Sequence, residues 1–579
     1  MIELAENNIQ TNPLDHHGIV AAVCKDLNIA ERINALLPVH DKRIVSPGTS
    51  VVAMILNGLG FTNRRLYLTP QFYESKSVAL LLGENLKASD LNDHTLGHAL
   101  DDIAQFGSCK LFGTIAFDIA LEHNLLGNLS HLDSTSISVS GEYGKNKNAE
   151  PATIQITYGH SKDHRPDLKQ LMLSLVVNGP SHMPIWMEPH SGNSSDKTTF
   201  HETIARVNAF KKQLSDNTEF KWVADSALYS KSKLLSSNEY LWLTRVPETI
   251  EEARALVLQP DSEIEWKDGG DGYKTLSTRS TYGGIEQRWL LVYSEQASKR
   301  EKKTCEKNWK KAEEVVSTAI WHLKNEVFGC IQDAENKVVE LKKKYSDFRF
   351  GVKILPVTKY NGKGKPKEGE KPRVIGYKID AVAAMNEDKM EEELNRKGRF
   401  ILATNELNGE NYSNEKMLSE YKEQQHVERG FQFLKEPWFM VDSVFLKSEK
   451  RIEALMMVMT LCLLVYNVAQ YRLRKKLVDE KETLPNQLGK QVQNPTMKWI
   501  FQIMEGVGVV RFFEEGSGEP VRELVTNMSE VRKKIIRLFG PTACRIYGLG
   551  LNPKNGPHDP TAGIRYLQAQ NPLSGDWDI

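Results

Sequence analysis

The stretch YKEQQHVERGFQFLK, residues 421–435, decides how the rest of the chain is interpreted. Read as one helix, it places Tyr421, Gln424, Glu428 and Lys435 within one broad stripe, because side chains three, four and seven positions apart share a face. That stripe holds a carboxylate and, seven residues later, an ammonium group. The pattern alone also fits an ordinary amphipathic helix whose polar face meets water. A functional interpretation therefore depends on acidic residues elsewhere in the chain.

Two aspartates upstream lie in segments that read as β-strands. Asp133 is in HLDSTSISVSG (131–141), which alternates in a strand-like register, and Asp225 ends the strand KWVAD (221–225). Open α/β sheets bind their ligands at the carboxyl ends of neighbouring strands. A buried aspartate is costly without a cation nearby, and that cation is either an Arg or Lys side chain or a metal ion. Two such aspartates together with Glu428 favour the metal ion.

The pattern around these acids predicts an α/β layer that is interrupted by an insertion. We expect strands at 131–141, 152–159, 171–179, 221–225 and 240–246, with a crossover helix at 197–214 between the third and the fourth. The strand RFILATNEL (399–407) returns just before the stretch at 421. We therefore expect a helical N-terminal domain at 1–125, the first part of the core at 126–250, an insertion subdomain of mixed α/β structure at 251–395, the second part of the core at 396–480 and a helical C-terminal region at 481–579.

Composition limits the class of protein. The 579 residues are 40% hydrophobic and 26% charged with a formal net charge of zero, so any DNA-binding surface must be a local patch. The six cysteines have no CxxC spacing and the first residues carry no secretory signal, which predicts reduced thiols in a cytosol. The apolar run from Ala454 is short and flanked by charges, so we expect a buried helix rather than a membrane span. His160 and His164 have a zinc-like spacing, but no second Cys or His pair accompanies them.

The region before the first strand has a helical pattern with two open interpretations. In LNDHTLGHALDDIAQFG (91–107), Asn92 or Asp93 could cap a helix whose apolar residues recur at helical spacing. Such a helix belongs either to a small module that touches DNA or to ordinary helix packing.

The chain resembles the bacterial insertion-sequence transposases of the DDE type, in particular the group marked by Y-x2-R-x3-E-x6-K. Tyr421, Glu428 and Lys435 match that signature, while Gln424 replaces its arginine, which puts in doubt the phosphate contact of that arginine. Further phrases that carry the resemblance are NPLDHHGIV (12–20), LNDHTLGHALD (91–101), YGHSKDHRPDLKQ (158–170), VADSAL (223–228), RFILATN (399–405) and VERGFQFLK (427–435). The resemblance spans nearly the whole chain.

The resemblance implies an RNase H-like core in which Asp133, Asp225 and Glu428 bind two divalent ions, Mg²⁺ or Mn²⁺. Such a pair of ions activates the attacking oxygen and stabilises the leaving one, and it needs only oxygen ligands. Tyr421, Gln424 and Lys435 would then face the DNA. Some relatives hold a flipped base against an aromatic ring, and Phe400 is the candidate here. The alternative is that Phe400 is an ordinary core aromatic in a strand.

We therefore expect a DNA transposase that cuts at the ends of its own element and joins them to target DNA. The alternatives are a metal-dependent nuclease of the same fold and a DNA-binding protein without catalytic activity. The expected partners are the terminal inverted repeats, the target DNA and a second copy of the chain in a homodimer. The expected location is the bacterial cytoplasm, at the nucleoid and without a membrane.

Overall fold

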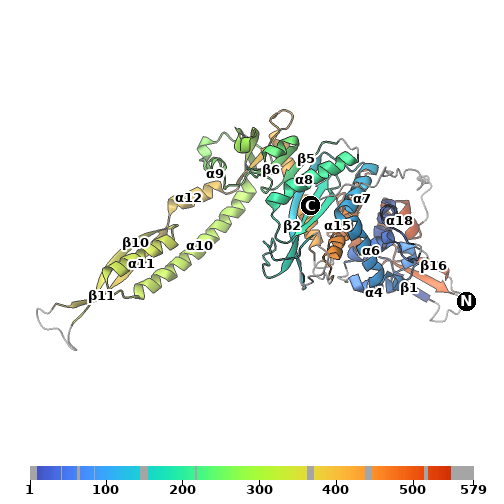
Figure 1. Cartoon of the computed structure of the whole chain (residues 1–579), viewed down its shortest axis with the longest axis horizontal. Helices are drawn as coiled ribbons and strands as arrows, with labels where there is room; N and C mark the ends of the chain where they lie inside the picture. Colours follow the sequence, from blue (N-terminus) through green and yellow to red (C-terminus); the bar gives the residue numbers. More distant parts are fainter. Residues whose placement is uncertain are drawn as a thin grey trace. The chain divides into compact units, whose positions relative to one another are not determined.

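The computed structural model describes residues 9–40, 42–61, 66–83, 85–141, 143, 154–214, 218–360, 371–436, 446, 448–513 and 520–549. Packing divides the chain into two compact units (Figure 1). The first unit joins Met1–Ile119 with Ser140–Glu142 and Leu434–Ile579, and the second joins Ala120–Val139 with Tyr143–Phe433. The N-terminal helices therefore form a unit with the C-terminal segment, although the two are far apart in sequence.

A long apolar helix, α15 (Glu449–Asp479), is the core element of the first unit. It contacts α1 (His17–Asp26), α3 (Pro47–Gly58), α6 (Asp93–Phe106) and α17 (Glu530–Phe539). By length and composition alone α15 could cross a membrane, but 89% of its most apolar window is buried inside the protein. This agrees with the predicted buried helix. By packing, α15 belongs with the N-terminal helices, whereas the sequence analysis grouped it with the core.

Shorter helices and a small sheet complete the first unit. The Asn92 side chain accepts a hydrogen bond from the Thr95 backbone N–H at 3.0 Å, which confirms the predicted cap of α6. The remaining helices are α2 (Ile29–Leu36), α4 (Thr69–Glu74), α5 (Val78–Leu82), α7 (Ser108–Glu122, which runs into the second unit), α16 (Met497–Met504) and α18 (Pro541–Ile546). The strands β1 (Ile9–Pro13), β15 (Gly508–Phe513) and β16 (Pro520–Thr526) pair in that order, and β13 (Leu484–Pro485) pairs with β14 (Gln491–Val492).

The second unit is built on a nine-stranded mixed sheet in the order β4-β3-β2-β5-β6-β12-β9-β8-β7. Its strands are β2 (Leu129–Val139), β3 (Lys169–Asn178), β4 (Met183–Ser191), β5 (Lys221–Ala224), β6 (Leu241–Arg245), β7 (Lys267–Asp268), β8 (Tyr273–Ser280), β9 (Gln287–Ser294) and β12 (Arg399–Thr404). The pairs β2–β5 and β5–β6 are parallel, and the other neighbours are antiparallel. The helix α8 (Asp196–Gln213) makes the crossover between β4 and β5.

One predicted strand is wrong, and one observed strand was missed. In the described part of 152–159, only Thr157 makes a β-bridge, with Gln170, so this segment is no strand of the sheet. The third strand is instead β4, which follows a tight turn at Gly179 and pairs along its length with β3. Pro184 and Pro189 hide β4 in the sequence, because proline usually argues against a strand that is paired on both sides. At the sheet edge, where β4 has only β3 as a neighbour, proline is tolerated.

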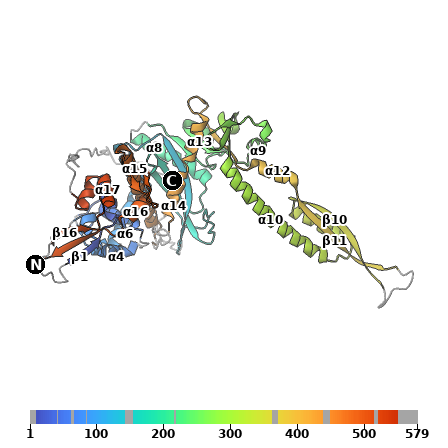
Figure 2. The same cartoon turned by 180° about the vertical axis from the view of Figure 1, so that it is seen from behind.

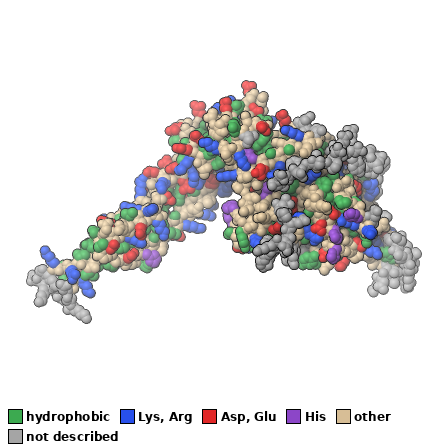
Figure 3. Space-filling view, in the orientation of Figure 1, with side chains coloured by type: hydrophobic (Ala, Val, Ile, Leu, Met, Phe, Trp, Pro, Cys, Tyr) green, Lys and Arg blue, Asp and Glu red, His purple; other side chains and the backbone are tan. Residues whose placement is uncertain are grey.

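The insertion carries an arm with its own hydrophobic core (Figure 2). The arm consists of α10 (Glu295–Asn325), α11 (Ile331–Lys344) and the hairpin of β10 (Phe348–Lys359) and β11 (Arg373–Met385). One face of the hairpin packs on the helices around Ile320, Val338 and Ile379. Lys and Arg side chains are spread over the surface of the arm (Figure 3).

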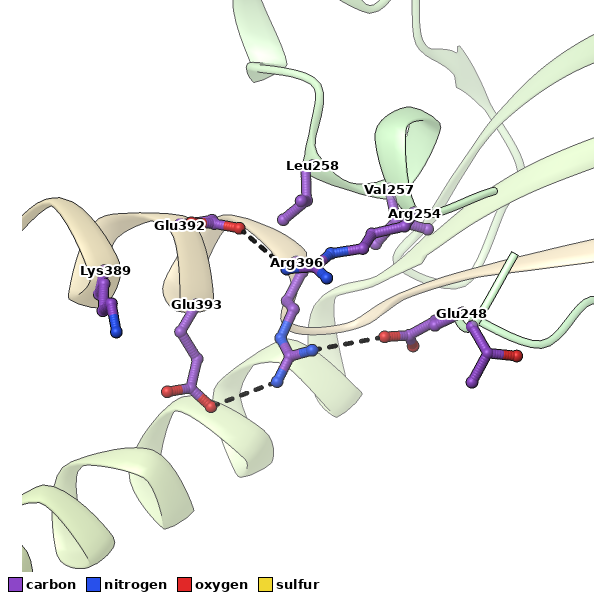
Figure 4. A pocket seen from close by; sticks show the side chains of 9 residues that line it. Glu248, Arg254, Val257, Leu258, Lys389, Glu392, Glu393 and Arg396 are labelled. Carbon is purple, nitrogen blue, oxygen red and sulfur yellow. Dashed lines mark hydrogen bonds and ion pairs between the residues drawn. The ribbon is translucent and has the colours of Figure 1, made fainter. Parts of the chain in front are cut away.

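Ion pairs join the helix that follows the arm to the segment between β6 and β7. Arg396, at the end of α12 (Glu387–Arg396), pairs with Glu248 and Glu393, and Arg254 of α9 (Glu251–Leu258) pairs with Glu392 (Figure 4). These side chains line a polar pocket of about 500 Å³. Because the partners are largely exposed, such pairs contribute at most about 1 kcal/mol each to stability.

Candidate active site

Sheet register sets Asp133 and Asp225 side by side. Leu132 of β2 pairs in parallel with Ala224 of β5, and each aspartate is the next residue along its strand. Neighbouring strands lie about 4.8 Å apart, and residues at matched positions point to the same face. Asp225 follows the last residue of β5, at the carboxyl end of the strand where open α/β sheets hold ligands. The sheet therefore brings these two predicted site residues together.

The two aspartates lie in an environment that disfavours their charged forms. Burial is the main cause that raises the pKa of Asp133 to about 7, and the charges of Asp225 and Asp196 raise it further. Burial likewise raises the pKa of Asp225, and Asp196 again adds to the shift. Three carboxylates thus repel one another in a partly dehydrated place, and a cation there would be stabilised.

One cation of the protein already lies among these carboxylates. The Lys162 Nζ is 2.9 Å from the Asp196 carboxylate and 3.9 Å from the Asp133 Oδ1. It also donates to the backbone oxygen and the hydroxyl of Ser134 at 2.7 and 2.8 Å. Its charge lowers the pKa of both Asp133 and Asp225, against the stronger effect of burial.

The stretch at 421–435 is not the single helix that its spacing predicts. It belongs to two helices, α13 (Asn414–Lys422) and α14 (Gln425–Leu434), separated by a turn at Glu423 and Gln424. The break lets the Gln424 side chain enter the protein, where its Nε2 donates to the Leu132 backbone oxygen at 2.9 Å. Its Oε1 lies 3.1 Å from the His131 Nδ1. These bonds connect the turn to His131 and Leu132 of β2.

Histidines support the start of α14. The His182 and His426 rings stack with centroids 3.5 Å apart and planes 8° apart. The His131 Nε2 lies 3.8 Å from a Glu423 carboxylate oxygen, and hydrogen bonding to His131 is the first cause that lowers the pKa of Glu423. Together these contacts fix the first turn of α14 against β2 and the β3–β4 turn. The same first turn carries Glu428.

The charge of Glu428 acts on the same tyrosine as the charges of Asp133 and Asp225. Glu428 is exposed on α14, and Tyr421 is half-buried on α13. Burial raises the pKa of the Tyr421 phenol to about 12, with the charges of Asp225, Glu428 and Asp133 acting in the same direction. The charges of all three predicted acids therefore reach the Tyr421 phenol, although no three acids among the described residues converge closely enough to hold one metal ion.

Arg245 is a cation near Tyr421 that the sequence analysis did not identify. Its charge lowers the pKa of Tyr421, and its guanidinium lies 5.4 Å from the Phe400 ring centroid. Phe400 is half-buried on β12, 6.2 Å from the Tyr421 ring and packed against a buried apolar cluster that includes Leu402 and Leu418. Arg245 ends β6, so only the strand pairing, which sequence does not give, brings it here. Lys435, the last site residue predicted, directly follows α14 and is half-buried.

Lys162 and Asp196 were likewise missed, although the sequence held a signal for Lys162. The segment HSKDH (160–164), considered for zinc, instead contributes this lysine. In the described parts of the chain, no three carboxylate, imidazole or thiol groups converge closely enough to hold one metal ion. His160 and His164 therefore form no zinc site with another described residue.

A groove opens beside the acids. It has a volume of about 750 Å³ and is lined by Lys162, Asp225, Lys197, Lys231 and Tyr282, among others. The Tyr282 ring stacks on that of Tyr229 with centroids 5.4 Å apart, and the Lys231 ammonium lies 5.8 Å from the Tyr282 centroid. A groove with lysines and an aromatic wall is a suitable surface for a nucleic-acid strand.

Comparison with known proteins gives two family matches. The model of the transposase DDE domain matches residues 128–465, and a domain of unknown function, DUF4277, matches residues 9–117. No curated protein matches the sequence. Among solved structures, the cryo-EM structure of a piggyBac transposase synaptic complex with hairpin DNA is similar at 10% identity and a TM-score of 0.34, over 86% of this chain and 82% of that one. We base no assignment on a structural likeness of this size.

Proposed function

The chain belongs to the family of transposases with a DDE domain, and from this premise we propose that Asp133, Asp225 and Glu428 are its catalytic acids. The protein is a DNA transposase, and the DDE domain implies that it depends on divalent metal ions. The single observation that carries the assignment is the register that sets Asp133 beside Asp225. Glu428 is included because it matches the acid of the family signature, and its charge acts on the same Tyr421 phenol as the two aspartates.

The proposed core is RNase H-like. The antiparallel order β4-β3-β2, the crossover helix α8 and the parallel strands β5 and β6 support this assignment. The insertion then lies between the second acid and the third, because α9 to α12 separate Asp225 from Glu428 in the chain.

The proposed ligands suit two Mg²⁺ or Mn²⁺ ions. All three acids offer oxygen atoms, which these hard cations prefer, and the repulsion among Asp133, Asp225 and Asp196 provides a place that gains from added positive charge. When bound, two such ions activate an attacking oxygen and stabilise the leaving oxygen of a phosphodiester. In this proposal the sheet positions Asp133 and Asp225, and the packing of α14 positions Glu428.

The neighbouring side chains would orient the DNA. Arg245, whose charge reaches the same phenol as the acids, is suited to hold a phosphate and to replace the arginine missing from the signature. Tyr421 and Lys435 are further candidates for contacts to the strand being cut. Phe400 is a candidate for stacking on a base, although its packing against the apolar cluster also fits a structural role. Gln424 is buried and bonded to β2, so we assign it a positioning role instead of the predicted DNA contact.

The proposed substrates are the terminal inverted repeats of the protein's own element and a target DNA, handled by a homodimer in the bacterial cytoplasm at the nucleoid. An assay with end-containing DNA and Mg²⁺ tests the assignment. Joined products support the complete reaction, whereas cut products without joining favour the nuclease alternative. A shift of the DNA band without cleavage would leave only DNA binding and would contradict the proposed acids.

A further inference from the structure

Lys162 is held at the acidic site from two directions. Its backbone N–H donates to the Ser136 hydroxyl at 2.9 Å, which fixes the loop of Lys162 to β2. Its ammonium donates to the Ser134 oxygens and pairs with Asp196, whose other carboxylate oxygen accepts from the Ser134 hydroxyl at 2.5 Å. The ammonium is therefore fixed at the mouth of the site, with 31% of its side chain exposed.

The charges at this place do not balance. One ammonium faces Asp133, Asp196 and Asp225, and the Asp133 Oδ1 is 3.9 Å away, too far for a hydrogen bond. A divalent ion brings more charge and binds carboxylate oxygens directly, so it would compete with the ammonium for the same oxygens.

We infer that Lys162 is an internal counter-ion, which stabilises the acidic site without metal, gives way to the divalent ion, and then contacts a phosphate of the DNA strand in the adjoining groove. This inference rests on the proposed catalytic acids. The groove already includes the Lys162 side chain together with Asp225 and Lys231. A lysine has a flexible stem with four carbons and a compact charge, so it can turn from the carboxylates to the groove without a change of the backbone.

The first experiment measures metal binding without DNA. Purified full-length protein is titrated with Mn²⁺, and free Mn²⁺ is followed by electron paramagnetic resonance. Lys162→Met is expected to bind the ion about tenfold more tightly than the wild type, because a competing charge is removed. Lys162→Arg keeps the charge and is expected to stay close to the wild type. Equal or weaker binding by a folded Lys162→Met would overturn the inference.

Matched variants separate this inference from the proposed acids. Lys231 lines the same groove but is not the lysine that lies among the carboxylates. Lys231→Met should therefore leave the affinity for Mn²⁺ unchanged. Asp133→Asn should weaken Mn²⁺ binding in the wild-type background. If Asp133→Asn leaves Mn²⁺ binding intact, the proposed ligand set fails, whatever the result at Lys162. Should Lys162→Met not fold, Lys162→Gln retains a polar side chain and serves in its place.

The second experiment measures DNA binding by fluorescence anisotropy, in EDTA and in Ca²⁺, a hard cation with the same preference for oxygen ligands. Without metal, Lys162 is engaged by the acids, so Lys162→Met should change the affinity for DNA little. With Ca²⁺, the freed lysine should contact phosphate, and the same variant should lose about tenfold in affinity. Lys231→Met should lose similar affinity under both conditions. A loss for Lys162→Met that is equal in EDTA and Ca²⁺ would show a constant phosphate contact and overturn the displacement.

Discussion

The Gln424 side chain donates a hydrogen bond to the backbone oxygen of Leu132, the residue that precedes Asp133. This bond joins the segment that leads into α14 to the strand that carries the first acid. Glu428 lies one turn beyond Gln424 on α14, so the position of Glu428 relative to Asp133 depends on the contact. The residue that departs from the family signature thus connects two parts of the site.

Replacing Gln424 tests this connection. Gln424→Leu fills the same space but leaves the Leu132 oxygen and His131 without their partner, which costs about 1–3 kcal/mol for buried polar groups. We expect a lower melting temperature and cleavage reduced by about an order of magnitude or more. Binding to end-containing DNA should change little. Gln424→Arg, which restores the residue of the signature, should also destabilise the protein, because it buries a charge beside His131. Normal cleavage by Gln424→Leu would refute the positioning role.

The three acids should be essential for chemistry and dispensable for binding. Replacing Asp133, Asp225 or Glu428 by Ala is expected to abolish cleavage of end-containing DNA in Mg²⁺, since each would remove oxygen ligands from the ions. Gel-shift affinity for the same DNA should remain close to that of the wild type. Asp196→Asn is an instructive comparison, because Asp196 is near the acids but is not a proposed ligand. If any one of the three Ala variants keeps near-normal cleavage, that residue is not part of the triad.

The sequence indicated candidate residues for this site but not their arrangement. Asp133 and Asp225 were proposed because a carboxylate within a strand or at its end stands out against an apolar pattern, and Glu428 because helical spacing set it near Tyr421. Helical spacing missed the break at Gln424, since the hydrogen bonds to Leu132 and His131 come from tertiary contacts. Arg245, Lys162 and Asp196 were missed because each is an ordinary surface residue in sequence, and only strand pairing and loop packing bring them to the acids.

For the fold as well, local patterns in the sequence were predictive and tertiary contacts could not be predicted. The crossover helix and the strands β2, β3, β5 and β6 were predicted, because their apolar periodicity is strong. The third strand, β4, was missed since its prolines contradict a strand in any position but a sheet edge. That α15 packs with the N-terminal helices could not be read from the sequence, because an apolar helix can be buried in either unit.

Salt dependence should distinguish phosphate contacts from surface charges. Lys435→Ala and Arg245→Gln are each expected to weaken DNA binding and to reduce the slope of log K against log salt by about one phosphate's worth, roughly 0.9. The exposed Lys299, which pairs with Glu295 on α10, offers a matched control in Lys299→Ala. An unchanged slope for Lys435→Ala would assign that lysine to the ordinary protein surface, and the same result for Arg245→Gln would remove the proposed substitute for the signature arginine.

Substitutions of Phe400 should show whether its ring stacks on a base or only packs in the core. With 2-aminopurine placed near the cleaved end, a stacked base should give a fluorescence change on binding that Phe400→Ala abolishes. Stacking contributes about 1–3 kcal/mol per base. Phe400→Leu serves as the control, because it keeps most contacts with Leu402 and Leu418 but has no ring. If both variants keep the fluorescence change and only Phe400→Ala lowers the melting temperature, Phe400 is a core residue and not a contact of the DNA.

Acid should destabilise the first unit through its buried histidines. Burial lowers the pKa of His16 to about 4, and burial also lowers the pKa of His17 well below its usual value. In the folded protein these two histidines bind fewer protons than in the unfolded chain, where histidines titrate near pH 6.5. The contribution of these histidines to the free energy of unfolding is therefore fully present above about pH 6.5. It is lost as the pH falls toward 4, by roughly 1.4 kcal/mol per pH unit for each histidine. The His16 Nε2 lies 2.8 Å from the Leu59 oxygen, and the His16 ring stacks on Phe501 with centroids 4.2 Å apart. The His17 ring stacks on that of His16 with centroids 4.4 Å apart.

Hydrogen exchange of the α1 and α16 amides between pH 7 and 5, corrected for the intrinsic effect of pH, measures this loss for the first unit alone. His16→Gln removes one titrating group, so its protection should fall less steeply with acid than that of the wild type, even if it starts lower. His40→Gln, at an exposed position, should leave the slope unchanged. Equal slopes for wild type and His16→Gln would mean that His16 takes up its proton without opening the helices, and the buried histidines would not be the cause of acid sensitivity.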